Sequence, residues 1–196
     1  MVQFLTMLYR FLKRCFDIIF SLILFIAFIP LWAVIPLLIR LDSPGRVIFT
    51  QKRVGRESSY FKIYKFRTMK EGTPDIPTDR VTNQEDMNTR LGTVLRRTSI
   101  DEIPQLYNIL KGEMSFVGPR PALHNQPGLI ELRKKKGADK IRPGVTGLAQ
   151  VSGRDSLTIP QKVEYDLQYV RKMSLWTDLR IIFITVRAVL TGKGGN

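Results

Sequence analysis

An uncharged, apolar run from Ile18 to Ile39 sets the strongest limit on what this chain can fold into. The run is long enough to lie inside a membrane, whereas helices in soluble cores rarely need so many apolar residues in succession. A cleaved signal peptide fits poorly, because no small-residue cleavage site follows and the run continues to Arg40. Residues 1–41 are therefore predicted to form a membrane-associated segment.

The position of Pro30 near the middle of the run predicts a bend. Proline has no N–H for the Ile26 carbonyl, so a helix is expected to break there. Each arm would then measure about 17 to 20 Å, enough to pass the middle of a ~30 Å hydrocarbon core. Basic residues flank both ends and favour the cytoplasmic side for both: Arg10, Lys13, Arg14, Arg40, Arg46, Lys52, Arg53 and Arg56. We predict a re-entrant helix, while length alone also allows a kinked span.

The charge balance points to anionic partners. The chain has 31 Lys and Arg against 17 Asp and Glu, a net charge of +14, which favours phospholipid, nucleotide or nucleic acid. Cys15 and His124 are each the single residue of their kind. The sequence thus excludes an internal disulfide and does not fit a zinc site or a Ser-His-Asp triad.

A β-hairpin is predicted after the apolar run. Apolar residues alternate in Val47–Gln51 and Tyr60–Phe66, and a short loop at 55–59 separates the two segments. The second strand places Lys65 and Arg67 on one face, either as phosphate ligands or as the solvated side of the strand. The polar segment that follows, Glu71–Asn88, is predicted to be a loop over a site.

The stretch Arg96–Pro121 contains the adjacent acids Asp101 and Glu102 among arginines. If Asp101 is a helix N-cap, Pro104 falls in the first turn, where it is tolerated. That register puts four apolar residues on one face: Ile103, Leu106, Tyr107 and Leu110. A Ser99 cap with Glu102 would form a capping box, but it would put Pro104 where an N–H is first needed.

A carboxylate at a helix start near arginines suits chemistry on phosphate. Free N–H groups and guanidinium groups bind phosphate oxygens, and Mg²⁺ lets a carboxylate and a phosphate approach each other. Aspartate can also accept a phosphoryl group covalently. The alternative for this stretch alone is that Asp101 only caps a helix.

The glycine-rich segment Ile141–Arg154 is predicted to form a tight loop. Its bare N–H groups could approach a phosphate, with Arg142, Gln150 and Arg154 as further contacts. The glycine spacing matches neither a P-loop nor a dinucleotide-binding motif.

Three helices are predicted in the second half of the chain. Leu129–Lys140 is highly charged, and Arg133–Lys136 is interpreted as a solvated face or a contact with anionic lipid. A helix beginning near Pro160 has an apolar face from which Asp166 is turned away. The segment Leu175–Leu190 suits a helix that packs on the core or lies half within the membrane interface. Together these segments predict an α+β fold, mostly helical, with a small sheet.

Three motifs in order resemble those of a known family. The runs KFRTM, DE before PQLYNILKGEMSFVGPRP, and RPGVTGLAQVSGR resemble the bacterial sugar transferases, monotopic polyprenol-phosphate phosphoglycosyl transferases. The resemblance covers about residues 10–190 and is to the minimal catalytic unit of the family. The bend departs from the family pattern, because Ile29 precedes Pro30 where relatives often have serine.

The resemblance implies transfer of a sugar phosphate from a UDP-sugar to undecaprenyl phosphate, with release of UMP. Asp101 maps onto the nucleophile that forms a covalent phosphosugar intermediate, and Mg²⁺ is implied as a cofactor at Asp101. Glu102 maps onto the partner acid, with a role in orientation, metal contact or proton handling. Eight residues are candidate substrate-binding residues: Lys65, Arg67, Arg96, Pro119, Arg120, Arg142, Gln150 and Arg154.

The resemblance also implies a monotopic protein on the cytoplasmic face of the bacterial inner membrane. Residues 1–41 would form the re-entrant helix, and residues 42–196 a catalytic domain with interfacial helices. Two other functions fit the residues: a basic, membrane-anchored binding protein for anionic lipid or nucleic acid, and a nucleotide-sugar hydrolase that uses the same acids. Nucleic acid is not an expected partner, because no recognised nucleic-acid-binding motif is present.

Overall fold

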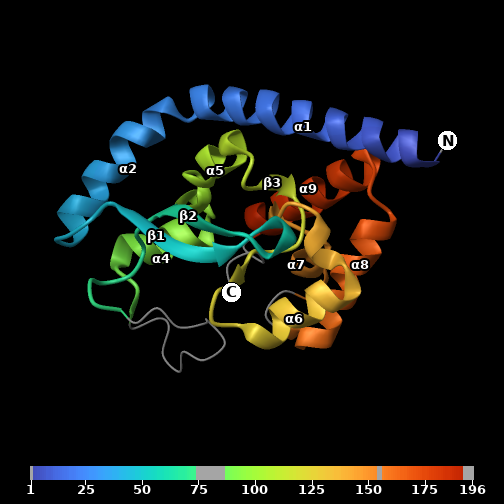
Figure 1. Ribbon diagram of the computed structural model, residues 1–196. Coiled ribbons are helices and arrows are strands. Elements are labelled where there is room, and N and C mark those ends of the chain that lie inside the picture. The colour runs from blue at the N-terminus through green and yellow to red at the C-terminus, as the bar shows by residue number, and fades with distance from the viewer. Residues whose placement is uncertain (1, 74–86, 154–155, 192–196) are drawn as a thin grey trace.

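The computed structural model describes residues 2–73, 87–153 and 156–191, and only the backbone of residues 2–6. The fold is mostly helical with two small sheets, which confirms the predicted α+β class (Figure 1). The α-helices are α1 Val2–Ala27, α2 Ile29–Asp42, α4 Arg90–Arg97, α5 Gln105–Lys111, α6 Pro127–Lys136, α7 Leu148–Ser152, α8 Ile159–Arg171 and α9 Leu175–Leu190. The strands are β1 Ile48–Val54, β2 Tyr60–Phe66, β3 Ser115–Val117, β4 Ala122–Leu123 and β5 Gly144–Thr146, and the short 3₁₀ helices are η1 Arg56–Ser58, η3 Ile100–Glu102 and η4 Ala138–Lys140.

A sharp bend separates the two N-terminal helices. Helix α1 stops at Ala27, and α2 continues from Ile29 at an angle of 62°. Pro30 lies in the first turn of α2, where no N–H is required of it, so the predicted bend is confirmed. In the part of the chain that the structure describes, no single helix is long and apolar enough to cross a membrane. The bent pair Met7–Ala27 and Ile29–Asp42 meets both requirements together, by length and composition.

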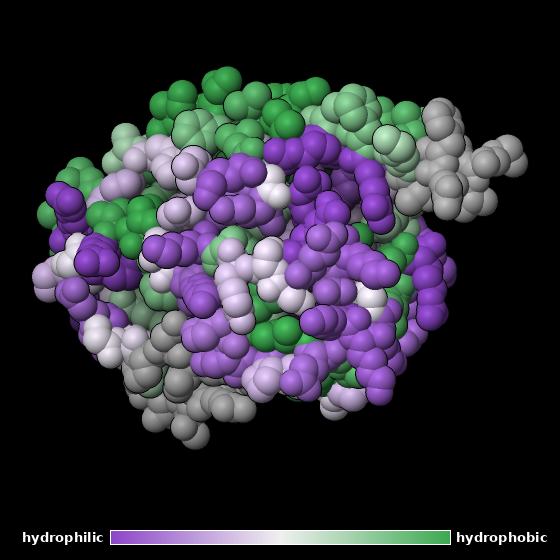
Figure 2. Space-filling model, in the orientation of Figure 1, coloured by the Kyte–Doolittle hydropathy of each residue, from purple (hydrophilic) through white to green (hydrophobic). Residues whose placement is uncertain are grey.

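Apolar side chains cover the outer face of α1 and α2. Figure 2 shows them as a green band along the edge of the molecule where α1 lies in Figure 1. The exposed apolar side chains of this band are Met7, Leu8, Phe11, Leu12, Ile19, Leu22, Ile23, Phe25, Ile26, Ile29, Val34, Leu37, Leu38 and Leu41. An exposed apolar patch of this extent marks a surface that binds a membrane or another protein.

The polar side chains of α1 face the rest of the protein. Tyr9, Lys13 and Asp17 are spaced four residues apart, so they lie on one side of the helix. Asp178 of α9 accepts hydrogen bonds from the Tyr9 hydroxyl at 3.0 Å and from Lys13 Nζ at 2.7 Å. Asp17 accepts one from the Ser115 hydroxyl at 3.0 Å. Lys13 is therefore an internal contact rather than a free charge beside the apolar run.

Two arginines from distant segments cap the C-terminal end of α5. Arg14 donates to the carbonyls of Ile109 at 2.6 Å and Leu110 at 2.9 Å, and Arg142 Nε donates to that of Gly112 at 2.8 Å. The Ile109 carbonyl also accepts from Gly112 N–H at 2.9 Å, and positive charge is favourable at this end of the helix dipole. Helix α1 is thus joined by hydrogen bonds to the helix that follows the acid pair.

The predicted β-hairpin is confirmed. Strands β1 and β2 pair antiparallel from Ile48 opposite Phe66 to Val54 opposite Tyr60, with η1 in the connecting loop. Strand β4 pairs with the other edge of β1, while β3 and β5 form a separate parallel pair. The hairpin presents Phe66 to the core, and the main hydrophobic cluster joins it to residues of α2, α4 and α5.

Two predictions about charged residues in α6 and α8 are wrong. Arg133 was expected on a solvated face and Asp166 was expected to turn away from the packed face, but both are buried. Arg133 donates to Asp166 Oδ2 from Nε at 2.8 Å, and its Nη2 lies 2.7 Å from the same oxygen. The other members of that basic run, Lys134–Lys136, are exposed. The ion pair explains how both charges are tolerated inside the protein.

Helix α9 has the predicted bounds. Ile181 and Asp178 are buried against the domain, so the helix packs on the core as expected. It also carries an exposed apolar stripe: Leu175, Trp176, Leu179, Phe183, Val186 and Leu190. The predicted loop at 71–88 lies mostly outside the described residues. Its ends are adjacent, because Lys70 N–H donates to the Met87 carbonyl at 2.9 Å.

Candidate active site

The acid pair lies in the short 3₁₀ helix η3, one turn before α5. Asp101 is therefore not the N-cap of an α-helix, and that prediction is wrong. The alternative capping box is wrong as well, because Ser99 makes no side-chain capping bond and has a left-handed backbone (φ 56°). Pro104 occupies the N-cap position of α5, where a proline is tolerated because it lies ahead of the first helical residue.

The apolar face predicted for this segment is correct in part. Ile103 and Leu106 are buried, and Ile109 belongs to the same core, but the Tyr107 ring is half exposed. The register differs because α5 begins at Gln105 rather than at Glu102. This shift leaves the two acids on a separate turn outside the helix.

Basic side chains surround the two acids. Lys65, from the end of β2, places its ammonium 2.5 Å from Glu102 Oε1 and 3.5 Å from Asp101 Oδ2. Arg120 places Nη1 3.8 Å from the same Glu102 oxygen. The structure thus brings together two predicted catalytic acids and two predicted phosphate-binding residues that are distant in sequence.

Burial raises the pKa of Asp101 above its ordinary value, although the surrounding cations oppose this effect. The residue is only 6% exposed, so desolvation penalises its charged form. Lys65 is the strongest opposing influence, Glu102 adds to the increase in pKa, and Arg96 and Arg120 lower it. Desolvation thus disfavours the ionised form of Asp101, and the three cations favour it.

Arg96 belongs to the electrostatic environment of the acids. It lies in the last turn of α4, and its Nη1 donates to Asn88 Oδ1 at 3.0 Å. Its positive charge favours ionised Asp101.

Arg67 points to a different part of the structure from Lys65. Its Nη2 donates to both the carbonyl and the hydroxyl of Ser43 at 2.7 Å, at the end of α2. Its Nε and Nη1 are buried without a hydrogen-bond partner among the described residues. The recorded contacts of Arg67 therefore link β2 to the bent helices, and substrate binding by this residue stays a prediction.

The segment 141–153 was predicted to be a tight loop, but most of it is regular structure. It contains β5 and α7, and its glycines permit close approach of two backbones. A Cβ atom on Gly144 would lie 2.1 Å from Gly118 N, and one on Gly147 would lie 2.1 Å from Gly118 O. The glycines are thus required for backbone packing between this segment and the one that carries Arg120.

The other candidates in and beside this segment have structural contacts. Arg142 caps α5, and burial is the main influence that lowers its pKa, with Arg14 and Arg56 adding to it. Gln150 Nε2 donates to the Val145 carbonyl at 2.9 Å, and its Oε1 is buried without a recorded partner. Arg154 lies outside the described residues. For all three, substrate binding stays a prediction.

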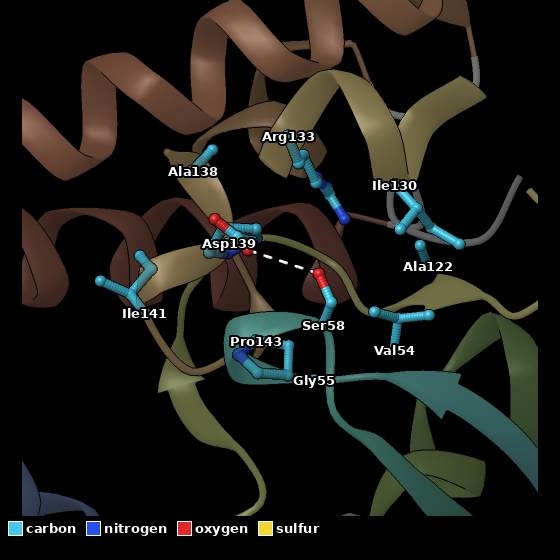
Figure 3. Close-up of a pocket in the computed structure, with 11 residues that line it drawn as sticks. Val54, Gly55, Ser58, Ala122, Ile130, Arg133, Ala138, Asp139, Ile141 and Pro143 are labelled. Atoms are coloured by element: carbon cyan, nitrogen blue, oxygen red, sulfur yellow. Dashed lines mark hydrogen bonds between the residues drawn. The ribbon is translucent and has the colours of Figure 1, made fainter. Parts of the chain in front are cut away.

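Pro119, next to Arg120 in the chain, lines a hollow that is separate from the acid pair. Figure 3 shows this hollow between the hairpin tip and η4, with Ser58 donating to Asp139 Oδ2 at 3.4 Å. Its lining includes Arg133 but neither of the two acids. Pro119 precedes Arg120 in the chain, and substrate binding by Pro119 stays a prediction.

The donor set at the acids suits Mg²⁺ that is held largely by substrate. Among the described residues, no group of three or more His, Cys, Asp or Glu is arranged to hold a metal. Mg²⁺ commonly binds one or two carboxylates together with phosphate oxygens and water. Glu102 Oε1 lies beside Lys65, so Asp101 is the better carboxylate ligand of the two.

The family of the chain follows from a comparison of sequences. The sequence model of the family described as bacterial sugar transferase matches residues 8–192, which is nearly the whole chain. The chain belongs to this family. All three motifs around the acid pair lie inside the matched region, so the predicted family is confirmed.

Three bacterial sugar transferase relatives illustrate the similarity. One from Komagataeibacter xylinus, named undecaprenyl-phosphate glucose phosphotransferase, is 43% identical over 89% of this chain and 35% of its own length. An Aeromonas hydrophila protein, named UDP-N-acetylgalactosamine-undecaprenyl-phosphate N-acetylgalactosaminephosphotransferase, is 38% identical over 96% of this chain and 46% of its own. The exopolysaccharide production protein ExoY of Rhizobium meliloti is 36% identical over 93% and 87%. The chain thus spans less than half of the first two relatives and most of the third.

Asn108 is a residue of this bacterial sugar transferase that sequence reasoning missed. It is fully buried and accepts a hydrogen bond from Tyr64 N–H at 3.1 Å. It donates to the Lys62 carbonyl and to Glu113 Oε2, both at 2.7 Å. The amide joins the edge of β2, just before Lys65, to α5 after the acids. The available signal was the place of Asn108 in the sequence among the apolar residues Leu106, Ile109 and Leu110.

Proposed function

We propose that the protein transfers a sugar phosphate from a UDP-sugar to undecaprenyl phosphate and releases UMP. The observation that carries the proposal is the buried carboxylate of Asp101 with Lys65, Arg96 and Arg120 around it. The named relatives support the reaction class, because two differ in their sugar but share undecaprenyl phosphate as acceptor.

Asp101 acts as the nucleophile in this proposal. Its carboxylate oxygen attacks the phosphorus next to the sugar, the bond from that phosphorus to the UMP oxygen breaks, and UMP leaves as an anion. A phosphate oxygen of undecaprenyl phosphate then attacks the same phosphorus and breaks the aspartyl bond. The product is a lipid diphosphate sugar, and Asp101 returns to its carboxylate form.

The basic residues supply electrostatic stabilisation. Negative charge builds up on the phosphoryl oxygens and on departing UMP, and fixed cations in a partly desolvated site stabilise it. Lys65 and Arg120 are in place for this role because both lie beside Glu102. Glu102 therefore orients the two cations, and Lys65 also keeps Asp101 ionised.

Magnesium completes the site in the proposal. Asp101 would hold Mg²⁺, which would neutralise charge that otherwise keeps the carboxylate and the diphosphate of the donor apart. In the proposal the protein excludes water from Asp101, and its basic residues Lys65, Arg96 and Arg120 favour ionised Asp101 and bind the phosphate groups.

We also place the protein on the cytoplasmic face of the bacterial inner membrane. The exposed apolar band of α1 and α2 would enter the bilayer, and the 62° bend would return the chain to the same side. Basic residues on both sides of the pair favour this topology. Residues 1–41 would form the membrane segment and 42–196 the domain at its surface, where lipid phosphate meets the site.

Intact-protein mass spectrometry tests the reaction. Detergent-purified protein is mixed with Mg²⁺ and a panel of UDP-sugars without lipid acceptor, and a mass gain equal to one sugar phosphate is expected with the true donor. Asp101→Asn and chelation of Mg²⁺ should each abolish the gain. Normal turnover with lipid acceptor but no adduct would contradict the covalent route. Full-rate UMP release without acceptor would indicate a hydrolase.

Cysteine labelling tests the topology. Cys15 is the single cysteine, so Arg10→Cys and Arg46→Cys can be examined separately in a Cys15→Ser background. Both positions are exposed and flank the bent pair. A membrane-impermeant maleimide should label neither in intact cells and both after permeabilisation. Labelling of only one position in intact cells would show that the pair spans the membrane.

A further inference from the structure

The Arg120 segment, residues Pro119–Pro121, is held in place by hydrogen bonds to its carbonyl groups. Pro119 and Pro121 have no N–H, so this stretch can be held mainly through its oxygens. The Pro119 carbonyl accepts from Gly144 N–H at 3.0 Å, and that of Pro121 accepts from Arg53 Nη1 at 3.1 Å. The carbonyl of Arg120 itself accepts from Arg133 Nη1 at 2.8 Å. Three consecutive carbonyls are thus held by three distant donors.

Arg133 is itself fixed in orientation. Its Nε and Nη2 both face Asp166 Oδ2, at 2.8 and 2.7 Å, which leaves Nη1 for the Arg120 carbonyl. Figure 3 shows the Arg133 side chain reaching from α6 into the hollow behind this segment. Asp166 is 2% exposed and Arg133 8%, so both charges are shielded from water and depend on these contacts. A lysine has a single nitrogen and cannot make the same set of contacts.

The ion pair between Arg133 and Asp166 orients a hydrogen-bond donor, which is a more specific effect than stabilising the fold. A buried ion pair often contributes little net stability compared with apolar residues, because removing its charges from water is costly. What a guanidinium supplies here is a donor at a fixed place, directed at the backbone of Arg120. The side chain of Arg120 reaches within 3.8 Å of Glu102.

We propose that Arg133, oriented by Asp166, is a positioning residue that sets the place of Arg120 at the acid pair. This inference rests on the proposed function, because it assigns Arg133 an effect on transfer through Arg120. The hydrogen bonds of Arg133 described above go to Asp166 and to the Arg120 carbonyl. Loss of its bond should let the Arg120 segment shift, and a shift of about 1 Å at a reacting group can lower a rate on the order of 100-fold.

A double-mutant cycle separates positioning from general structural damage. The rate of adduct formation is measured in wild type, Arg133→Lys, Arg120→Ala and the double variant. Arg133→Lys should lower the rate by about 10- to 100-fold in the wild-type background. It should have little further effect once Arg120 is alanine. An equal loss in both backgrounds would overturn the inference.

Controls keep the result interpretable. Arg171 on α8 also pairs with an acid, Glu164 at 4.0 Å, but its side chain is 69% exposed, so Arg171→Lys should leave the rate unchanged. If Arg133→Lys fails to fold, Asp166→Asn replaces it in the cycle, because it keeps the side-chain shape and one acceptor oxygen.

A structural readout does not depend on turnover. Wild-type protein that is inactive on every donor would contradict the proposed function alone. The inference is then decided by an experimental structure of Arg133→Lys. Displacement of Arg120 Nη1 from Glu102 by about 1 Å or more would support it. An unchanged Arg120 side chain would overturn it.

Discussion

The ammonium of Lys65 lies 2.5 Å from the carboxylate of Glu102. The same ammonium is 3.5 Å from Asp101, so its direct ion pair is with the neighbour of the proposed nucleophile. A lysine in this place supports Asp101 by its charge and leaves the Asp101 oxygens available for phosphorus.

Replacing Lys65 should move the acid limb of the pH profile to higher pH. Burial raises the pKa of Asp101, and Lys65 is the strongest influence that lowers it. In Lys65→Met that pKa should rise further, so less Asp101 is ionised at any given acidic pH. The rate of adduct formation against pH measures the shift. Lys62→Met, an exposed residue of the same strand, is the control and should not move the limb. If the acid limb stays at the same pH in Lys65→Met, it reports the titration of a group other than Asp101.

Asn108 should be sensitive to an isosteric change. Asn108→Asp can still accept from Tyr64 N–H, but it loses both donated bonds and places a carboxylate beside that of Glu113. Burying this charge beside a second carboxylate, with only the Tyr64 N–H as donor, should lower the free energy of unfolding by about 3 kcal/mol or more. Chemical denaturation in detergent measures the loss. Asn125→Asp, at an exposed position, should change stability by less than about 0.5 kcal/mol.

Local signals in the sequence predicted the local structure well. The bend follows from Pro30, the hairpin from alternation in β1 and β2, and α9 from an apolar run with few charges. Each depends on residues close together in the chain. The meeting of Lys65, Arg120 and the acids was expected only through resemblance to a family, because no local pattern shows that these segments pack together.

Errors arose where a distant partner decides the outcome. Arg133 was interpreted as solvated because it begins a basic run, yet Asp166, 33 residues away, pairs with it in the interior. Asp101 was placed at a helix start by the position of Pro104, but the backbone turns first through η3. The glycines of 141–154 suggested a phosphate loop, and their actual constraint is the backbone of Gly118. None of these partners can be identified from the segments alone.

The contact between α1 and α9 should be important for stability. Asp178 is buried and accepts from Tyr9, Lys13 and Tyr169, the last at 2.6 Å. Asp178→Leu leaves the Lys13 ammonium without its carboxylate and should cost about 3 to 5 kcal/mol. Adding Lys13→Met removes the unpaired charge and should recover part of that loss. Melting temperatures in detergent compare the variants, and a double variant less stable than Asp178→Leu would contradict this account.

Two glycine substitutions should act in opposite directions. A Cβ atom on Gly144 would lie 2.1 Å from Gly118 N and 2.3 Å from Thr146 O, and these backbone atoms cannot move without breaking the pairing of β3 and β5. Gly144→Ala should therefore cost about 3 kcal/mol or more. In Gly128→Ala the nearest atom to the new Cβ is 3.9 Å away, and the residue lies in α6, so stability should rise by up to about 1 kcal/mol. Thermal unfolding of both variants gives the comparison. Equal tolerance of the two alanines would show that the backbones of these segments are not in the close contact on which the Arg120 segment depends.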